Sequence, residues 1–250
     1  MTSTPAVKLT GLTKRFGKRT VVNNINLVVP SGGFYGIVGP NGAGKSTTLS
    51  MIAGLLKPDS GHISVAGFDV VKDREHVLES IGIMMEGLSL PERLTGAELL
   101  TYTARLRGME DGWQQRATDL LEVLGLDKIP STLIIDYSTG MRKKIGLAVA
   151  ILHVPKVLVL DEPFEAIDPV SARAIMELLK QYVAGGGTVL LSSHIMDVVE
   201  AYCERVVLIK DGTVVIEGAV SDITSDSSLD DVFIKVVGKT QERNLDWLTS

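Results

Sequence analysis

Short apolar runs separated by turns recur along the chain and predict a protein built around β-sheets. Val7 to Leu9 and Val21 to Val29 indicate the first two strands, and the polar stretch from Lys14 to Lys18 indicates a turn between them. The run before Asp161 holds four consecutive branched apolar residues, a pattern typical of a parallel strand buried on both faces. The other apolar runs predict strands at residues 34–38, 62–65, 81–85, 188–193, 206–210 and 214–217.

Apolar residues at helical spacing indicate a helical insertion in the middle of the chain. Between Thr95 and Leu126 they predict two helices, broken near Gly108 to Gly112. Because this stretch separates the strands on either side, it predicts an inserted α-helical subdomain, about residues 88–154, rather than another strand–helix unit. Single helices are predicted elsewhere at residues 46–54, 72–79, 141–152, 170–184 and 196–202.

Composition and charge exclude several classes of protein. With 45% apolar residues, the chain of 250 residues can bury a sizeable core. Its formal charge of −5, from 25 basic and 30 acidic residues, is not the electrostatic footprint of a nucleic-acid-binding protein. The single cysteine, Cys203, excludes an internal disulfide and a cysteine-cluster metal site, which favours the cytosol. The longest apolar region, Ile145 to Leu160, is interrupted by polar residues and a proline, so no membrane span is predicted.

One strand-to-helix turn carries a phosphate-binding motif. It fits the pattern G-x-x-x-x-G-K-[ST] and consists of Gly39, Pro40, Asn41, Gly42, Ala43, Gly44, Lys45, Ser46 and Thr47. Its glycines let backbone N–H groups approach phosphate oxygens, and the N-terminus of the following helix adds a partial positive charge. We therefore expect Lys45 to reach the β- and γ-phosphates of a bound ATP, and the Ser46 hydroxyl to coordinate Mg²⁺.

Two adjacent carboxylates at the end of the buried strand complement this phosphate loop. In open α/β sheets, ligands lie beyond the carboxyl ends of the strands. Asp161 at that position can hold Mg²⁺ through water, as the carboxylate partner of the phosphate loop. Glu162, one residue further, can orient and deprotonate an attacking water. The pair therefore predicts a hydrolytic site for a nucleotide.

The order of these features resembles the ATP-binding cassette (ABC) ATPases. Phosphate loop, helical insertion, Ser-x-Gly segment, Asp-Glu strand end and strand-terminal histidine follow one another as in that family, from about Val7 to Val237. The resemblance implies an α/β fold with a P-loop NTPase (RecA-like) core, an N-terminal antiparallel β subdomain and the inserted helical subdomain. It implies a single ABC ATPase domain over residues 1–237, followed by a polar C-terminal tail at residues 238–250.

The resemblance also implies an ATP site shared between two domains. In this family two ATPase domains pair head to tail, and ATP lies between the phosphate loop of one and the signature segment of the other. Ser138 and Gly140 match signature residues that contact the γ-phosphate of the partner's ATP. His194 matches the histidine that contacts the γ-phosphate, although alone it would be taken as structural. Phe16 matches the aromatic residue that stacks on adenine; without the resemblance, packing in a small core explains it better.

Two positions depart from the family pattern. The signature usually has Leu-Ser-Gly-Gly-Gln, whereas this chain has Thr139 and Met141 at the third and fifth of these positions. Glu86 stands where the family usually has a glutamine that ligates Mg²⁺ and senses the transmembrane partner. Glutamate keeps an oxygen ligand but adds a negative charge and loses the amide donors. A metal-proximal Glu86 and a surface glutamate in a loop are both open alternatives.

The expected function is that of the ATP-hydrolysing subunit of an ABC transporter. Because no membrane span is predicted, the permease would be a separate integral-membrane subunit that holds this chain at the cytoplasmic face of the cell membrane. A second ATPase subunit, expected to be another copy of the chain, would complete the site, and no nucleic acid is involved. Resemblance over the whole chain favours an exporter. The alternative is a soluble single-cassette ABC ATPase of the iron–sulfur assembly type.

Overall fold

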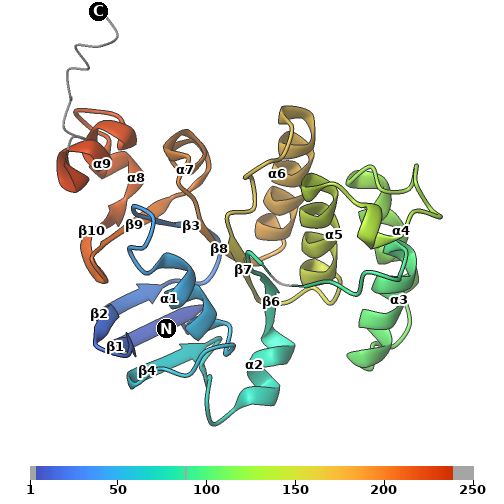
Figure 1. The fold of residues 1–250 in the computed structure, drawn as a ribbon, viewed down its shortest axis with the longest axis horizontal. Coiled ribbons are helices and arrows are strands. Elements are labelled where there is room, and N and C mark those ends of the chain that lie inside the picture. Colours follow the sequence, from blue (N-terminus) through green and yellow to red (C-terminus); the bar gives the residue numbers. More distant parts are fainter. Residues whose placement is uncertain (1–3, 88, 239–250) are drawn as a thin grey trace, which may run out of the picture.

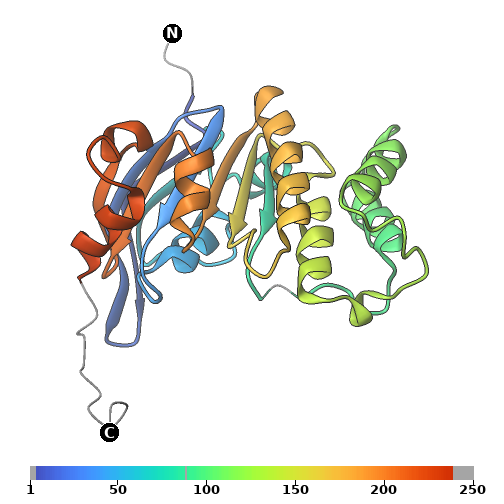
Figure 2. The ribbon, with the colours of Figure 1, turned by 90° about the horizontal axis from the view of Figure 1, so that it is seen from above.

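Residues 4–87 and 89–238 are described by a computed structural model of the chain. Apart from Gly238, the predicted polar tail lies outside these residues. None of the helices that they form has the length and apolar character required to cross a bilayer. The described residues contain two β-sheets and a group of helices that lies at one end of the molecule, opposite the C-terminal helix (Figures 1 and 2).

A six-stranded sheet forms the centre of the fold (Figure 1). Its strands, in spatial order, are β10 (Thr213–Ala219), β9 (Arg205–Lys210), β3 (Gly33–Val38), β8 (Thr188–Ser192), β7 (Val157–Asp161) and β6 (Ile81–Met84). Neighbouring strands are parallel, except that β10 pairs antiparallel with β9. The segments that follow β3, β7 and β8 therefore emerge at the same edge of the sheet, which brings the phosphate loop, Glu162 and His194 together.

The second sheet has four strands and is antiparallel, with the order β2 (Arg19–Val29), β1 (Val7–Phe16), β4 (Ser60–Val65) and β5 (Phe68–Asp69). The turn predicted between the first two strands is confirmed but is shorter than the stretch from Lys14 to Lys18. Because β1 continues to Phe16 and β2 begins at Arg19, only Gly17 and Lys18 form the turn. In β1, Lys14 pairs with Val22 and Phe16 pairs with Arg19. The register of the pairing shifts on both sides of Lys14. Pairing with a neighbouring strand can keep the backbone of polar residues extended, because their side chains can point to solvent.

The central sheet is buried on both faces. Leu158 and Leu160 of β7 pack into one apolar core, whereas the alternate residues Val157 and Val159 pack into another. The second core also contains α1 (Lys45–Ile52) and the inner face of the antiparallel sheet, so α1 is held between the two sheets. The first core contains α5 (Thr139–Ile151), α6 (Pro169–Ala184) and α7 (Met196–Tyr202).

The helical insertion lies between β6 and β7, as predicted. It consists of α3 (Gly96–Leu106), α4 (Trp113–Val123), the 3₁₀ turn η1 (Ile134–Asp136) and α5. Thr95 begins α3 through a capping box, in which its hydroxyl accepts from the Glu98 N–H and the Glu98 carboxylate accepts from the Thr95 N–H. The expected break between two helices is confirmed, because α3 ends before Gly108 and α4 begins after Gly112.

Three further helices complete the described part of the chain: α2 (Arg74–Ser80), α8 (Val220–Ile223) and α9 (Leu229–Val237). The C-terminal helix α9 is tied to β9 at its C-terminal end and to α7 at its N-terminal end. The Lys210 ammonium donates to Val236 O at 2.8 Å, and the Leu229 N–H donates to the Glu200 carboxylate at 2.8 Å. These contacts place α9 beside the end of β9, close to the phosphate loop.

Candidate active site

The phosphate loop depends on two glycines for its close packing. A side chain at Gly39 would collide with the carbonyl oxygen of Ile209 in β9. Gly44 has a φ of 105°, and a Cβ there would lie 2.6 Å from the carbonyl oxygen of Val21. The loop therefore fits between β9 and β2 only with glycine at both positions. Within it, the buried Lys45 ammonium donates to Gly39 O at 2.8 Å, which fixes the charge at the mouth of the loop.

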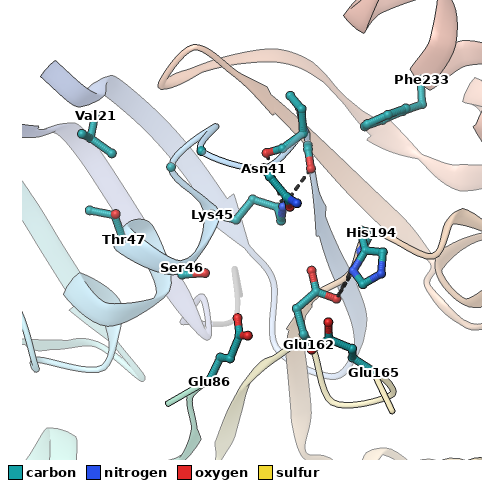
Figure 3. Close-up of a pocket in the computed structure, with 14 residues that line it drawn as sticks. Val21, Asn41, Lys45, Ser46, Thr47, Glu86, Glu162, Glu165, His194 and Phe233 are labelled. Carbon is teal, nitrogen blue, oxygen red and sulfur yellow. Dashed lines mark hydrogen bonds and ion pairs between the residues drawn. The ribbon is translucent and has the colours of Figure 1, made fainter. Parts of the chain in front are cut away.

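A cavity of about 630 Å³ opens over this loop (Figure 3). Most of the predicted motif lines the cavity, and carboxylates and an imidazole stand opposite it. The lining residues are Val21, Gly39, Pro40, Asn41, Gly42, Gly44, Lys45, Ser46, Thr47, Glu86, Glu162, Glu165, His194 and Phe233. A backbone cradle with one ammonium group, facing a general-base candidate, is an arrangement suited to phosphate-ester chemistry.

Glu162 and His194 are in hydrogen-bond contact on the far wall of this cavity. The Glu162 Oε2 atom lies 2.9 Å from His194 Nδ1 and accepts from the His194 backbone N–H at 3.2 Å. Glu162 has a φ of 49°, in the left-handed region, and its side chain is only 9% exposed, whereas that of His194 is 49% exposed. The histidine therefore holds the carboxylate from the solvent side, and Figure 3 shows both groups on the wall opposite Lys45.

Asp161 lies beneath the phosphate loop with one oxygen bonded and the other free. Its Oδ1 accepts from Ser46 Oγ at 3.2 Å and from Ser192 Oγ at 2.5 Å, while the buried Oδ2 has no partner. Among the described residues no group of three or more His, Cys, Asp or Glu side chains could hold a metal by itself. A carboxylate oxygen and a hydroxyl leave several positions for phosphate and water oxygens, the coordination that Mg²⁺ prefers. The residues present therefore fit Mg²⁺ bound together with a nucleotide.

Four predicted nucleotide-binding residues lie outside the cavity. Ala43 is buried: its N–H donates to Pro40 O, and its carbonyl oxygen accepts from the Gly212 N–H at 3.1 Å. Phe16, at the end of β1, is 52% exposed, with the Lys14 ammonium 5.7 Å from its ring centroid. Because Phe16 is half exposed and belongs to neither apolar core, its position does not support core packing.

Ser138 and Gly140 belong to the N-terminus of α5 and are also separate from the cavity. Ser138 is the N-cap residue, and its hydroxyl accepts from the Met141 N–H at 3.2 Å. A Cβ at Gly140 would lie 3.2 Å from the carbonyl oxygen of Ala166, so the helix start packs closely on the loop after Glu162. Within one chain these two residues therefore stand apart from the phosphate loop.

Glu86 follows β6 and lines the main cavity. Figure 3 shows its side chain directed towards the space between Ser46 and Glu162. It also lines an adjoining, more apolar groove of about 380 Å³ with residues of α5 that include Thr139 and Lys143. Glu86 is thus placed where an extra negative charge would act on a metal or on phosphates, which favours the metal-proximal alternative over a distant surface position.

Several residues at the site were not predicted from the sequence. Phe233 projects from α9 towards the cavity, and Glu165 comes from the loop after β7 (Figure 3). Lys143 of α5 donates to Glu162 O at 2.7 Å and pairs with Glu165 at 3.2 Å, so it connects the helical insertion to the end of β7. An aromatic residue in a C-terminal helix and a lysine in a polar helix face carry no sequence signal for such positions.

The fold and this site define a P-loop nucleotide-binding ATPase. A family model described as ABC transporter matches residues 22–165 of the chain. The linearmycin resistance ATP-binding protein LnrL of Bacillus subtilis is 38% identical over 213 residues, which cover 85% of this chain and 68% of that protein. The Nod factor export ATP-binding protein I of Burkholderia lata is 37% identical over 207 residues, covering 82% of this chain and 68% of that protein.

Solved structures agree with the sequence comparison. An ATP-binding subunit of an ABC transporter superposes with a TM-score of 0.88 at 30% identity, covering 93% of this chain and 100% of that one. A dimeric ATP-binding cassette in a post-hydrolysis state with ADP and Pi gives a TM-score of 0.77 at 28% identity, covering 86% and 98%. The chain therefore belongs to the ABC transporter family, as an ATP-binding subunit that hydrolyses ATP.

Proposed function

We propose that the chain drives export through a separate membrane permease by closing on ATP as a head-to-tail homodimer and hydrolysing it. The observation that carries the hydrolytic part is the single cavity in which the phosphate loop faces Glu162 and His194. Each group stands where phosphoryl-transfer chemistry needs it, because catalysis in such sites consists of positioning and charge stabilisation.

Each residue of the proposed site has a distinct role. Lys45 and the loop N–H groups bind the phosphates, and Ser46 and Asp161 hold Mg²⁺, with Glu86 close by. Mg²⁺ supplies neutralisation of the charge that develops on the phosphate oxygens. Glu162 orients water and accepts its proton, while His194 keeps the carboxylate aimed into the cavity through the 2.9 Å contact. Phe16, at the open side of the hairpin, remains our proposal for the adenine contact.

The proposal of a homodimer is supported by the position of the signature segment. Ser138 and the α5 N-terminus present a hydroxyl and a partial positive charge outside the cavity, and we propose that they act on the nucleotide of another subunit. The related cassette with ADP and Pi was solved as a dimer. A second copy would therefore bring its signature segment to the γ-phosphate bound by the first.

Export and a membrane partner are supported by the relatives. One relative's name states Nod factor export and another's linearmycin resistance, and each is named as an ATP-binding protein. These relatives support a transporter subunit and give no support to the iron–sulfur assembly alternative. We propose that the chain works at the cytoplasmic face of the cell membrane, held there by the permease.

The experiment that tests the site is Lys45→Ala, with binding measured by titration calorimetry using the non-hydrolysable analogue AMP-PNP. Loss of a charged donor to the β- and γ-phosphates should weaken binding by about 10- to 100-fold. Lys57→Ala removes an exposed lysine that does not line the cavity, and it should leave affinity unchanged. Equal affinities for Lys45→Ala and wild type would contradict the proposed phosphate site.

A further inference from the structure

Ser192 is a buried serine at the end of an otherwise apolar strand, next to the two acidic residues. It is the last residue of β8, is 0% exposed, and pairs in register with Asp161 of the neighbouring parallel strand. The preceding residues of β8 contribute Val189, Leu190 and Leu191 to the core. A hydroxyl in such surroundings is costly unless both its donor and its acceptor capacity are used.

Both capacities of the Ser192 hydroxyl are used, and each is directed to a different acidic residue. The hydroxyl accepts from the Glu162 backbone N–H at 3.0 Å and donates to Asp161 Oδ1 at 2.5 Å. One side chain therefore links the peptide group of the general-base candidate to the carboxylate of the metal-site candidate. Among the described residues, no other side chain forms hydrogen bonds to both Asp161 and Glu162.

The link restricts the rotation of the Asp161 carboxylate. Oδ1 is occupied by Ser192 and by Ser46, which leaves Oδ2 as the buried oxygen without a partner. If Ser192 lacked its hydroxyl, the plane of the carboxylate could turn about its terminal bond, a torsion with broad minima. The hydroxyl thus fixes the plane of the carboxylate and the direction in which its unpartnered oxygen points.

The same link supports an unfavourable backbone at Glu162. A φ of 49° is uncommon for a residue with a side chain, and it persists only where the surroundings hold it. The Glu162 N–H is held by Ser192 at 3.0 Å, and its carbonyl oxygen is held by Lys143 at 2.7 Å. From this conformation the Glu162 side chain reaches His194 across the cavity wall.

We propose that Ser192 is a positioning residue that sets Asp161 for Mg²⁺ and Glu162 for water activation at the same time. The proposal rests on the proposed function, because it concerns the same hydrolytic site. It predicts that loss of the hydroxyl impairs the Mg²⁺-dependent part of nucleotide binding together with turnover, while the phosphate loop itself still binds nucleotide.

The test compares Ser192→Ala with wild type by titrating AMP-PNP in Mg²⁺ and in EDTA, and by measuring ATP turnover against Mg²⁺ concentration. We expect similar affinities in EDTA, and a loss of about 10- to 100-fold in Mg²⁺ affinity or turnover, as for residues that orient metal ligands. Ser193→Ala is the matched control, because Ser193 is buried at the next position but bonds to the Ile195 backbone. Ser192→Thr retains the hydroxyl and should restore most of the loss.

Every outcome of this comparison either supports or contradicts a positioning role for Ser192. Unchanged Mg²⁺ dependence and turnover in Ser192→Ala would overturn the proposal, and so would an equal loss of affinity in EDTA, which would indicate a structural role alone. If the alanine variant does not fold, Ser192→Cys replaces it, since a thiol keeps the volume but is a weak donor and acceptor. A wild-type protein that binds AMP-PNP equally with and without Mg²⁺ would instead overturn the proposed function.

Discussion

His153 shows at the scale of one residue how burial fixes a protonation state. It lies after α5, with Nε2 3.1 Å from the carbonyl oxygen of Ile81, and its Nδ1 is buried without a partner. A carbonyl oxygen needs a donor, so this contact places a proton on Nε2. Burial, followed by the charge of Arg107, lowers the pKa of His153 from 6.5 to about 4.

The lowered pKa of His153 predicts a stability loss on acidification. Above pH 6.5 the ring is neutral in both states, whereas between pH 6.5 and about 4 only the unfolded chain binds the proton. The free energy of unfolding should therefore fall across this window and level off below it, by about 2 kcal/mol after allowance for partial solvent contact.

The measurement is urea unfolding from pH 7.5 to pH 4 of wild type and His153→Gln, whose amide can still donate to Ile81 O. The variant should lose less stability on acidification than wild type. His62→Gln, at an exposed position, should follow the wild-type curve. Parallel curves for wild type and His153→Gln would refute a buried neutral imidazole.

Residues in local motifs could be predicted from the sequence, and residues brought in by tertiary contacts could not. The phosphate loop was found because its glycines, Lys45 and flanking elements are adjacent in the chain. The role of Ser192 could not be predicted, because a serine at the end of a strand normally marks a turn. Phe233 lines the cavity from α9, a helix whose position is fixed by tertiary contacts to Lys210 of β9 and Glu200 of α7.

Helices and strands were predicted correctly where the periodic pattern of apolar residues extended over enough positions to be recognised. The helices α3, α4 and α6 and the strands of the central sheet confirm the apolar patterns. The shortest elements, β5, η1 and α8, were not predicted, because two to four residues cannot show a period. The extension of β1 to Phe16 was missed because pairing with β2 and β4, rather than its own polar sequence, holds it extended.

At the scale of elements, α2 and α3 form an open groove of about 460 Å³ suited to a partner helix. It is lined by two leucines, Leu78 and Leu106, and by the polar or charged residues Glu75, Glu79, Thr103 and Arg107. Leu106 is 69% exposed, which is unusual for a large apolar side chain inside a groove. Exposed apolar surface rimmed by polar residues marks interaction sites, so we propose that a short helix of the permease docks here.

The docking proposal predicts that Leu106→Glu releases the permease. A carboxylate in place of Leu106 would have to lose its hydration when the helix docks, which disfavours the complex. Affinity purification of the tagged variant from detergent-solubilised membranes should recover much less of the multi-span protein that accompanies wild type. Val123→Glu introduces the same charge on the exposed side of α4 and should retain the partner. Equal recovery with both variants would place the permease elsewhere on the chain.

At the scale of the whole molecule, the hydrolytic site is divided between two surfaces of the same chain. The cavity provides the phosphate loop and Glu162, whereas Ser138 and the N-terminus of α5 lie outside it. Lys143 ties this same helix to the peptide of Glu162 at 2.7 Å. In the proposed dimer, the signature segment that closes on the second copy's nucleotide would be joined through Lys143 to the general-base candidate of its own chain, which would couple the two sites.

This division predicts that Glu162→Gln traps an ATP-bound dimer. Glutamine fills the same space but accepts no proton from water, so ATP should bind and persist while turnover is lost. Size-exclusion chromatography should show a monomer without nucleotide and a dimer with ATP and Mg²⁺, whereas wild type returns to monomer as it hydrolyses. Glu177→Gln, on the exposed face of α6, should hydrolyse ATP as wild type does.

A second substitution identifies the surface that closes the trapped dimer. Ser138→Arg in the Glu162→Gln background puts a bulky side chain at the N-cap of α5, where the second copy's γ-phosphate is proposed to lie. The double variant should bind ATP but stay monomeric, because the phosphate loop is intact and the facing surface is blocked. A double variant that still dimerises on ATP would show that the two copies meet through another surface. Turnover by Glu162→Gln at the wild-type rate would show instead that Glu162 is not the base.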